Sequence, residues 1–290
     1  MNDHVPVLLR EVLQWLPSAD GPLARYADCT LGGGGHTSAI LKARPQAVVT
    51  ACDVDGAAIK RAQENFSPEI ESGRLHLHHG LFSALPEAAE GYDAILADLG
   101  YSSIQLSDAS YGLSFQEEGP LDMRLKRPAS GPTAWDIIRG APVSTIAAIL
   151  RDYGEVDGAG KLATRMQEAV HRGDITDSTG SLAAWVEKNA GGGHRRTHPA
   201  TKVFQALRIA VNDEMRELDR FLKTAILKLK PRGRLLVITF HSLEDRMVKR
   251  LKDTAGMRAL TKKAIEPQED EVQSNPRSRS AKLRVIERAP

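Results

Sequence analysis

The sequence predicts an α/β protein built on an open, mostly parallel sheet that is interrupted by a helical insertion. Short apolar, strand-like runs alternate with helix-like segments over residues 26–98. Residues 107–201 are instead polar and helical, with turns rich in glycine and proline, and the α/β alternation resumes after them. Because strands that alternate with helices form βαβ units, we expect the two outer segments to build one sheet rather than two domains in series.

The domain boundaries follow from this interruption. We expect residues 1–106 and 202–290 to form a discontinuous sheet domain, and residues 107–201 to form the insertion. The chain has 290 residues, which is long enough for a substantial core.

The first segment of the sheet domain is expected to open with a helix and to contain four strands. Val5–Leu16 places its apolar residues on one face, which indicates an amphipathic helix. A second helix is expected from His36 onward. The predicted strands are Tyr26–Thr30, Val48–Asp53, Leu75–His78 and Tyr92–Asp98.

Helices dominate the middle of the chain, and strands return near its carboxyl terminus. The helices expected in the insertion are Ala134–Arg139, Val143–Tyr153, Lys161–Arg172 and Ser181–Asn189. One long helix over Lys202–Lys230 leads back to the sheet. The elements expected after it are the strand Arg234–Phe240, the helix Leu243–Lys252 and a final strand Lys282–Arg288. Between these last two, Glu266–Glu271 is expected to be a solvated acidic loop.

Composition indicates a soluble globular protein of the cytoplasm. Hydrophobic residues make up 41% of the chain and charged residues 26%, and the net charge of +2 is too small to indicate nucleic-acid binding by itself. Cys29 and Cys52 lie in predicted strands and are expected to be buried, reduced thiols. There is no membrane-length apolar run, no basic signal region and no metal-ligand spacing among the histidines, so no membrane and no metal are predicted.

Four consecutive glycines, Gly32, Gly33, Gly34 and Gly35, separate the first predicted strand from a helix-like segment that begins at His36. Glycines at this position let the backbone turn sharply and let a ligand approach the main chain. The next strand ends in Asp53. Strand, glycine turn, helix, strand and terminal carboxylate form the arrangement with which an open α/β sheet holds a nucleoside and its ribose hydroxyls, although glycines alone would also suit a flexible loop.

The glycine turn fits a nucleoside better than a dinucleotide. The G-x-G-x-x-G pattern of dinucleotide enzymes would require glycine where this chain has Thr37, and a threonine would crowd the close packing of helix on strand. A nucleoside ligand without a pyrophosphate is therefore favoured, and S-adenosylmethionine is the commonest of these.

The fourth predicted strand ends in Asp98, and Tyr101 follows three residues later. This spacing is typical of methyltransferases that act on exocyclic amino groups. The lone pair of such an amine is delocalised into the base, so an acceptor for its N–H steers the lone pair toward the methyl group. Tyr101 could stack on the base. Alternatively, Asp98 only caps the turn after the strand.

Basic segments elsewhere suit contacts with phosphates. His194–His198 and Lys202 form a cationic loop beside glycines 191–193, and Arg277 and Arg279 precede the last strand. In the helix that begins near His198, Arg208 and Asn212 are four residues apart and share one side, which also suits a salt-bridged surface helix. His241 follows a strand, and we expect it to position substrate or to be structural rather than to act as a base.

Eight sequence blocks together make the chain resemble one family, the bacterial ribosomal RNA small-subunit methyltransferase H family, also called MraW. The blocks are His4–Leu8, Asp28–Thr37, Asp98–Leu106, Gly112–Phe115, Gly119–Leu125, His198–Ile209, Phe240–Arg246 and Asn275–Arg284. They run from one end of the chain to the other, so jointly they are far more specific than any one motif.

The resemblance implies a class I S-adenosylmethionine-dependent methyltransferase: a Rossmann-like sheet, mostly parallel with an antiparallel last strand, and a helical insertion that recognises RNA. The implied reaction transfers a methyl group from S-adenosyl-L-methionine to the exocyclic N4 of a cytidine in the decoding centre of 16S ribosomal RNA. The target cytosine must then be unstacked, because N4 is inaccessible in a paired helix. The implied partner is 16S ribosomal RNA or the small ribosomal subunit.

The resemblance implies cofactor contacts from Gly34, Gly35, His36, Asp53, Phe82, Asp98 and Gln105, and the glycine turn itself adds Gly32 and Gly33. The resemblance and the residue patterns described above together indicate the residues that contact the RNA. Substrate contacts are expected from Tyr101, Ser102, Asp122, Arg124, His198, Arg208, Asn212, His241, Ser242, Arg277 and Arg279. Asp98 is also the candidate catalytic residue. Two other functions stay open from the residues alone: a small-molecule methyltransferase, and a non-catalytic RNA-binding module that retains the nucleoside fold.

Overall fold

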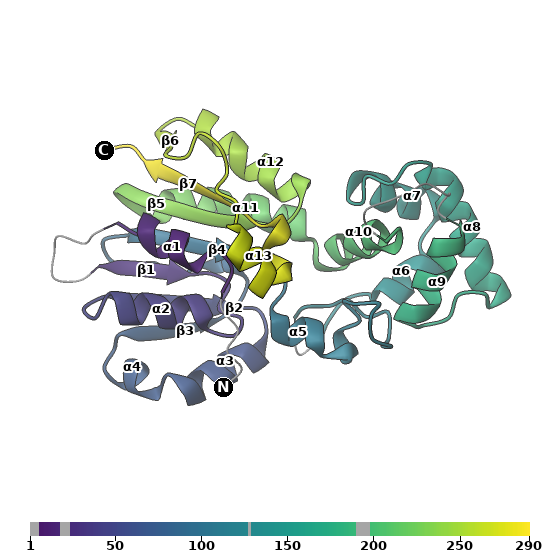
Figure 1. Cartoon of the computed structure of the whole chain (residues 1–290), viewed down its shortest axis with the longest axis horizontal. Coiled ribbons are helices and arrows are strands. Elements are labelled where there is room, and N and C mark those ends of the chain that lie inside the picture. Colours follow the sequence, from purple (N-terminus) through teal and green to yellow (C-terminus); the bar gives the residue numbers. More distant parts are fainter. Residues whose placement is uncertain (1–5, 18–23, 127–128, 190–197) are drawn as a thin grey trace. The chain divides into compact units, whose positions relative to one another are not determined.

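The computed structural model describes residues 6–17, 24–126, 129–189 and 198–290. Within it the chain divides into two compact units, the first made of Met1–Ser102 and Met215–Pro290 and the second of Ser103–Glu214 (Figure 1). The second unit extends beyond the predicted insertion, residues 107–201, at both ends. The basic residues expected just upstream of His198, and the first residues of the His4–Leu8 block, lie outside the described residues.

The first unit is built on a seven-stranded sheet in the order β3-β2-β1-β4-β5-β7-β6 (Figure 1). Strands β1 to β5 are parallel, whereas β7 runs antiparallel to β5 and β6 antiparallel to β7. The expected mostly parallel sheet with an antiparallel last strand is therefore confirmed. The strands are β1 (Arg25–Asp28), β2 (Val48–Asp53), β3 (Leu75–His79), β4 (Tyr92–Asp98), β5 (Leu229–Thr239), β6 (Met257–Ala259) and β7 (Lys282–Arg288). Of these, β6 was not predicted.

Side chains that alternate along the central strands fill two separate cores, one on each face of the sheet. In β4, Ala94 and Leu96 pack on one face while Ile95 and Ala97 pack on the other. Helices α1 (Leu9–Trp15), α2 (Gly35–Ala43) and α3 (Gly56–Asn65) contribute to the first core. Helices α11 (Glu214–Lys228) and α12 (Ser242–Arg250) contribute to the second. The sheet is thus covered on both faces, as a parallel sheet requires.

The prediction of one long helix over Lys202–Lys230 is wrong, because two helices form there and the first ends just before Asp213. This residue has a left-handed backbone with φ of 50°, and its N–H turns back to the carbonyl of Ala210. Aspartate tolerates this conformation better than most residues, so it can end one helix and start another. The two helices are α10 (Ala200–Asn212) and α11.

The acidic stretch near the carboxyl terminus is not only a solvated loop, so that expectation is wrong for Glu271. Glu271 lies in the short helix α13 (Glu269–Ser274), and its Oε1 accepts the N–H of Leu8 at 2.7 Å. Leu8 stands at the start of α1 in a left-handed conformation. Burial raises the pKa of the Glu271 carboxyl, although the Leu8 hydrogen bond opposes this. Glu271 therefore caps the start of α1 through Leu8, a residue 263 positions away in the chain.

The second unit is helical (Figure 1), and its own core is formed by the helices expected in the insertion together with α10. Helix α10 packs on three of them, and α8 packs on α6 and α7. The other helices of this unit are α5 (Ser103–Ser107), α6 (Ala134–Gly140), α7 (Val143–Asp152), α8 (Ala159–Arg172) and α9 (Thr179–Asn189). The four predicted helices of the insertion are thus confirmed to within two residues at each end.

The two cysteines are free and buried, as predicted: Cys52 lies in β2, and Cys29 directly follows β1. No helix in the described part of the chain is long and apolar enough to cross a membrane.

Candidate active site

Three neighbouring strands of the first unit each end in an aspartate. Strand β1 pairs in parallel with β2 on one side and with β4 on the other. Asp28 ends β1, Asp53 ends β2 and Asp98 ends β4. The order of the strands reverses between β1 and β4, and open α/β sheets bind ligands beyond the carboxyl ends of strands at this switch point. The carboxylates therefore gather where a ligand is expected.

The glycine turn follows β1 and is tied to Asp53. The backbone N–H of Gly32 donates to Asp53 Oδ2 at 2.7 Å, and the N–H of Asp55 donates to Asp53 Oδ1 at 2.8 Å. Burial raises the pKa of the Asp53 carboxyl, while these two donors oppose the shift. Each carboxylate oxygen keeps a further lone pair, so a fixed Asp53 can also accept from two vicinal hydroxyls.

Glycine is required at two positions of the turn. Gly34 stands at the start of α2 with φ of 80°, and a Cβ there would lie 2.8 Å from the Phe66 ring. A Cβ on Gly35 would lie 2.4 Å from Cγ of Pro6. The turn can therefore pass close to its neighbours and lead into the amino terminus of a nine-residue helix, while Gly33, just before these two glycines, is exposed.

Asp28 and Thr30 fix the glycine turn through hydrogen bonds. Neither residue was predicted from the sequence to have a role in the site. Asp28 is fully buried, accepting the hydroxyl of Thr37 at 2.7 Å and the N–H of Thr30 at 3.2 Å. The hydroxyl oxygen of Thr30 in turn accepts the N–H of Asp98 at 2.7 Å. Asp28 could have been predicted from its position at the end of a strand, directly before the glycine turn.

His36 connects the turn to the amino-terminal segment. Its Nε2 donates to the carbonyl of Val7 at 3.0 Å, so Nδ1 is left with a lone pair, and Nδ1 lies 3.7 Å from Asp98 Oδ2. Burial lowers the pKa of His36, against the opposing charge of Asp28. His36 is therefore a neutral, buried ring that fixes the wall beside Asp98.

Asp98 has an oxygen with no hydrogen-bond partner. Its side chain is 24% exposed, but Oδ1 is itself buried and accepts no hydrogen bond from any described residue. Burial raises the pKa of the carboxyl well above its usual range, and the charges of Asp28 and Glu244 add to the shift. A buried, unpaired carboxylate oxygen is costly, and a cationic ligand or an N–H donor would relieve that cost.

Phe82 and the residues after β4 complete the part of the site in the first unit. Phe82 opens a 3₁₀ turn after β3, and its half-buried ring packs edge to face on Phe221 with centroids 5.1 Å apart. Tyr101 is 38% exposed, and Ser102 packs close to Gly32. The structure thus brings the glycine turn, Asp53 and Asp98 to one edge of the sheet.

His241 and Glu244 form a capping box at the start of α12. The N–H of Glu244 donates to His241 Nδ1 at 3.4 Å, and Glu244 Oε2 accepts the N–H groups of Phe240 and His241 at 2.8 and 3.4 Å. His241 Nε2 also lies 3.2 Å from Glu244 Oε1. These contacts give His241 a structural role. Contacts of His241 and the exposed Ser242 with substrate stay a prediction.

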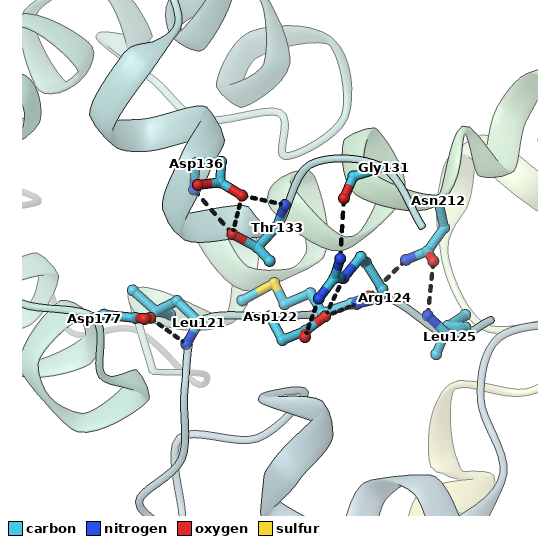
Figure 2. Close-up of polar contacts among 10 residues, drawn as sticks. Leu121, Asp122, Arg124, Leu125, Gly131, Thr133, Asp136, Asp177 and Asn212 are labelled. Atoms are coloured by element: carbon cyan, nitrogen blue, oxygen red, sulfur yellow. Dashed lines mark hydrogen bonds and ion pairs between the residues drawn. The ribbon is translucent and has the colours of Figure 1, made fainter. Parts of the chain in front are cut away.

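In the second unit, a ladder of contacts fixes the segment Leu121–Leu125 (Figure 2). Arg124 donates to both oxygens of Asp122, at 2.8 and 2.7 Å, and also to the carbonyl of Gly131 at 3.0 Å. Asn212 Nδ2 donates to the carbonyl of Met123 at 2.7 Å, and its Oδ1 accepts the N–H of Leu125 at 2.9 Å. Met123 has φ of 62°, so these bonds hold a strained backbone in place.

The remaining predicted residues lie in both units. Gln105 is buried in α5, with its Nε2 3.5 Å from the carbonyl of Leu125, and Arg208 forms a two-bond ion pair with Glu214 at 2.8 and 2.9 Å. The ring of His198 stacks at a tilt on Phe115, with centroids 4.8 Å apart. Arg277 and Arg279 are exposed in a 3₁₀ turn before β7, without a hydrogen bond or ion pair to any described residue. The roles of these residues stay predictions.

The strand order of the first unit, with a glycine turn after β1 and carboxylates at the ends of β2 and β4, defines a class I S-adenosylmethionine-dependent methyltransferase. The model of the MraW methylase family matches residues 1–289. The chain therefore belongs to the MraW methylase family.

Curated relatives agree along the whole chain. Ribosomal RNA small subunit methyltransferase H of Crocosphaera subtropica is 43% identical over 288 residues, covering 99% of this chain and 90% of the relative. The protein of the same name from Thermomicrobium roseum is 43% identical over 310 residues, covering 98% and 93%. Among solved structures, an rRNA methylase from Streptococcus thermophilus matches 99% of each chain with 10% identity and a TM-score of 0.47.

Proposed function

We propose that this protein transfers a methyl group from S-adenosyl-L-methionine to the exocyclic N4 of a cytidine in 16S ribosomal RNA, in the cytoplasm where the small ribosomal subunit is found. Membership of the MraW methylase family supports the reaction, and the names of the relatives support the small-subunit RNA as substrate. The observation that carries the proposal is the buried, unpartnered Oδ1 of Asp98 at the switch point of the sheet, beside the glycine turn.

The described residues of the first unit fit the cofactor. The two free lone pairs of Asp53 suit the ribose hydroxyls, and the glycine turn with the first N–H groups of α2 suits the methionine carboxylate. Phe82 offers an apolar face for the adenine. When bound, S-adenosylmethionine supplies an electrophilic methyl group on a positively charged sulfur, and the unpaired Oδ1 of Asp98 suits a cation or an N–H donor.

Asp98 is also the residue best suited to orient the target amine. A carboxylate oxygen that accepts the N4 hydrogen turns the nitrogen lone pair toward the methyl group and stabilises the charge that develops on nitrogen. Its neighbour His36 is neutral with Nδ1 unprotonated, so the wall of the site offers no competing donor from that ring. Tyr101, exposed three residues later, is suited to stack on the flipped cytosine.

Incubation with tritiated S-adenosylmethionine tests the proposed reaction. We expect label to enter 16S ribosomal RNA in small subunits from a strain that lacks this activity, and digestion followed by mass spectrometry to find it as N4-methylcytidine. Free cytidine and small subunits from the wild-type strain are the controls, and neither should be labelled. Label in free nucleosides alone, or on another atom of the base, contradicts the proposal.

Arg277 and Arg279 are expected to contact the RNA backbone. Replacing both by alanine should reduce the slope of log affinity against log salt by about 1.4, because each phosphate contact with a single strand contributes about 0.7. The measurement is filter binding of 16S RNA over a range of salt. The matched control replaces Lys42 and Lys60, exposed cations of α2 and α3, and should leave the slope unchanged. Equal slopes for the two double variants would exclude this surface.

Asp98 is expected to make cofactor affinity depend on pH. Its carboxyl keeps a proton above the ordinary aspartate pKa of about 3.9, and the cationic cofactor favours the ionised form. Affinity should therefore rise with pH until Asp98 is ionised. The free protein should lose stability over the same window, because its native state holds this proton more tightly than the unfolded chain does. In the Asp98→Asn variant, calorimetry should show a weaker pH dependence of cofactor affinity, and thermal melting a weaker pH dependence of stability. Unchanged pH profiles would contradict the assignment of these effects to Asp98.

A further inference from the structure

One face of α11 contacts the turn that contains Phe82 through two hydrogen bonds and a ring contact. Glu217 Oε1 accepts the backbone N–H of Ser83 at 3.0 Å, and the ring of Phe221 meets the ring of Phe82 at an interplanar angle of 74°. Farther along the helix, Lys228 Nζ donates to the carbonyl of Leu85. Glu217 and Phe221 are four residues apart, so they lie on the same side of the helix. The backbone beside Phe82 and the Phe82 ring are thus held by adjacent turns of one helix.

The Glu217 carboxylate is buried at this contact. Its side chain is 5% exposed, its Oε2 is buried without a hydrogen bond, and Nη1 of Arg220 lies 3.6 Å from that oxygen. A buried carboxylate is unfavourable for stability unless it is well paired, so an apolar residue would serve the core better at this position. What Glu217 supplies, and an apolar residue cannot, is a fixed acceptor for the amide that directly follows Phe82.

We infer that Glu217 is a positioning residue for the cofactor: by holding the Ser83 amide, it keeps the Phe82 ring where that ring covers the adenine. The inference rests on the proposed function, because it takes Phe82 as part of the cofactor site. The contact joins residues 134 positions apart, so the adenine side of the site is set by a helix of the carboxyl-terminal segment and not only by β3. The turn itself is a single 3₁₀ turn, Phe82–Ala84, which has few internal bonds to hold the ring.

Two variants separate the position of the acceptor from its charge. Glu217→Gln keeps an oxygen at the same reach and should bind S-adenosylmethionine within about twofold of the wild type, because the Ser83 hydrogen bond survives. Glu217→Asp keeps the charge but draws the oxygen back by one methylene, and should bind about tenfold more weakly. A role of the charge itself would reverse this order. Asp219→Asn, on the exposed side of α11 and paired with Lys223, is the control and should change nothing.

Double-mutant cycles test whether Glu217 acts through Phe82. With Phe82→Ala already present, Glu217→Asp should cause no further loss of cofactor affinity; with Asp53→Ala present, the full loss of about tenfold should remain. In steady-state assays KM for S-adenosylmethionine should rise while kcat at saturating cofactor stays unchanged. Thermal melting of each variant checks that the fold is kept.

Three results would contradict a positioning role of Glu217. Full affinity in Glu217→Asp, or a loss that persists in the Phe82→Ala background, overturns the positioning role. Phe82→Ala with unchanged affinity removes Phe82 from the cofactor site and overturns the inference as well. If the Phe82→Ala variant still forms N4-methylcytidine, the proposed reaction stands even though the inference about Glu217 fails.

Discussion

Replacing Asp53 by alanine is expected to weaken the binding of S-adenosylmethionine by at least about 100-fold, because hydrogen bonds to a charged group contribute about 1.5–3 kcal/mol each and two ribose hydroxyls lose their acceptor. The same change releases the N–H of Gly32, which Asp53 holds at 2.7 Å, so the glycine turn loses its anchor too. Isothermal titration calorimetry with S-adenosylmethionine and with S-adenosylhomocysteine measures the loss, which should be similar for the two ligands because both carry the same ribose.

Asp55 provides the matched control for this prediction. It is a buried carboxylate two residues farther along, and it caps α3 by accepting the N–H of Ala57 at 2.9 Å. Asp55→Ala should cost about 1 kcal/mol of stability through the lost cap and leave cofactor affinity near the wild-type value. If both variants lost affinity equally, the effect would be a general disturbance at the end of β2, and Asp53 would lose its assigned role as ribose acceptor.

The sheet was predictable because its signals are local. Buried parallel strands are apolar runs that end abruptly in polar residues, so β2 and β4 could be bounded from the sequence at Asp53 and Asp98. The glycine turn was visible for the same reason. Since parallel strands present equivalent ends at one edge, the approach of these two carboxylates to the glycines also followed from the sequence.

Contacts between distant parts of the chain could not be predicted in this way. Glu217 meets Ser83 across 134 positions and Glu271 meets Leu8 across 263, and no periodicity or spacing links either pair. The His241–Glu244 capping box is local but was still missed, because histidine is not among the residues that usually cap helices. The break at Asp213 was hidden by apolar residues that continue at helical spacing through both α10 and α11.

Replacing Gly112 by alanine should destabilise the second unit more than the same replacement at Gly131. Gly112 has φ of 64°, and a Cβ would lie 1.9 Å from the carbonyl oxygen of Pro120 and 3.0 Å from the N–H nitrogen of Asp122. These are backbone atoms of the segment that leads into the Asp122–Arg124 pair in Figure 2, and they cannot move aside as a flexible side chain could. Left-handed strain of about 1–2 kcal/mol and overpacking of about 1–3 kcal/mol should add.

Gly131→Ala isolates the strain from the collision. Gly131 has φ of 84° but nothing within 4 Å of a Cβ, so this variant should lose only the conformational part, about 1–2 kcal/mol. Urea unfolding of the two variants and the wild type, followed by circular dichroism, measures the difference in the free energy of unfolding. An equal loss in both variants would mean that Pro120 and its neighbours yield to a methyl group. The Asp122–Arg124 segment would then be fixed by its hydrogen bonds, such as those of Asn212 with Met123 and Leu125, and not by its packing against Gly112.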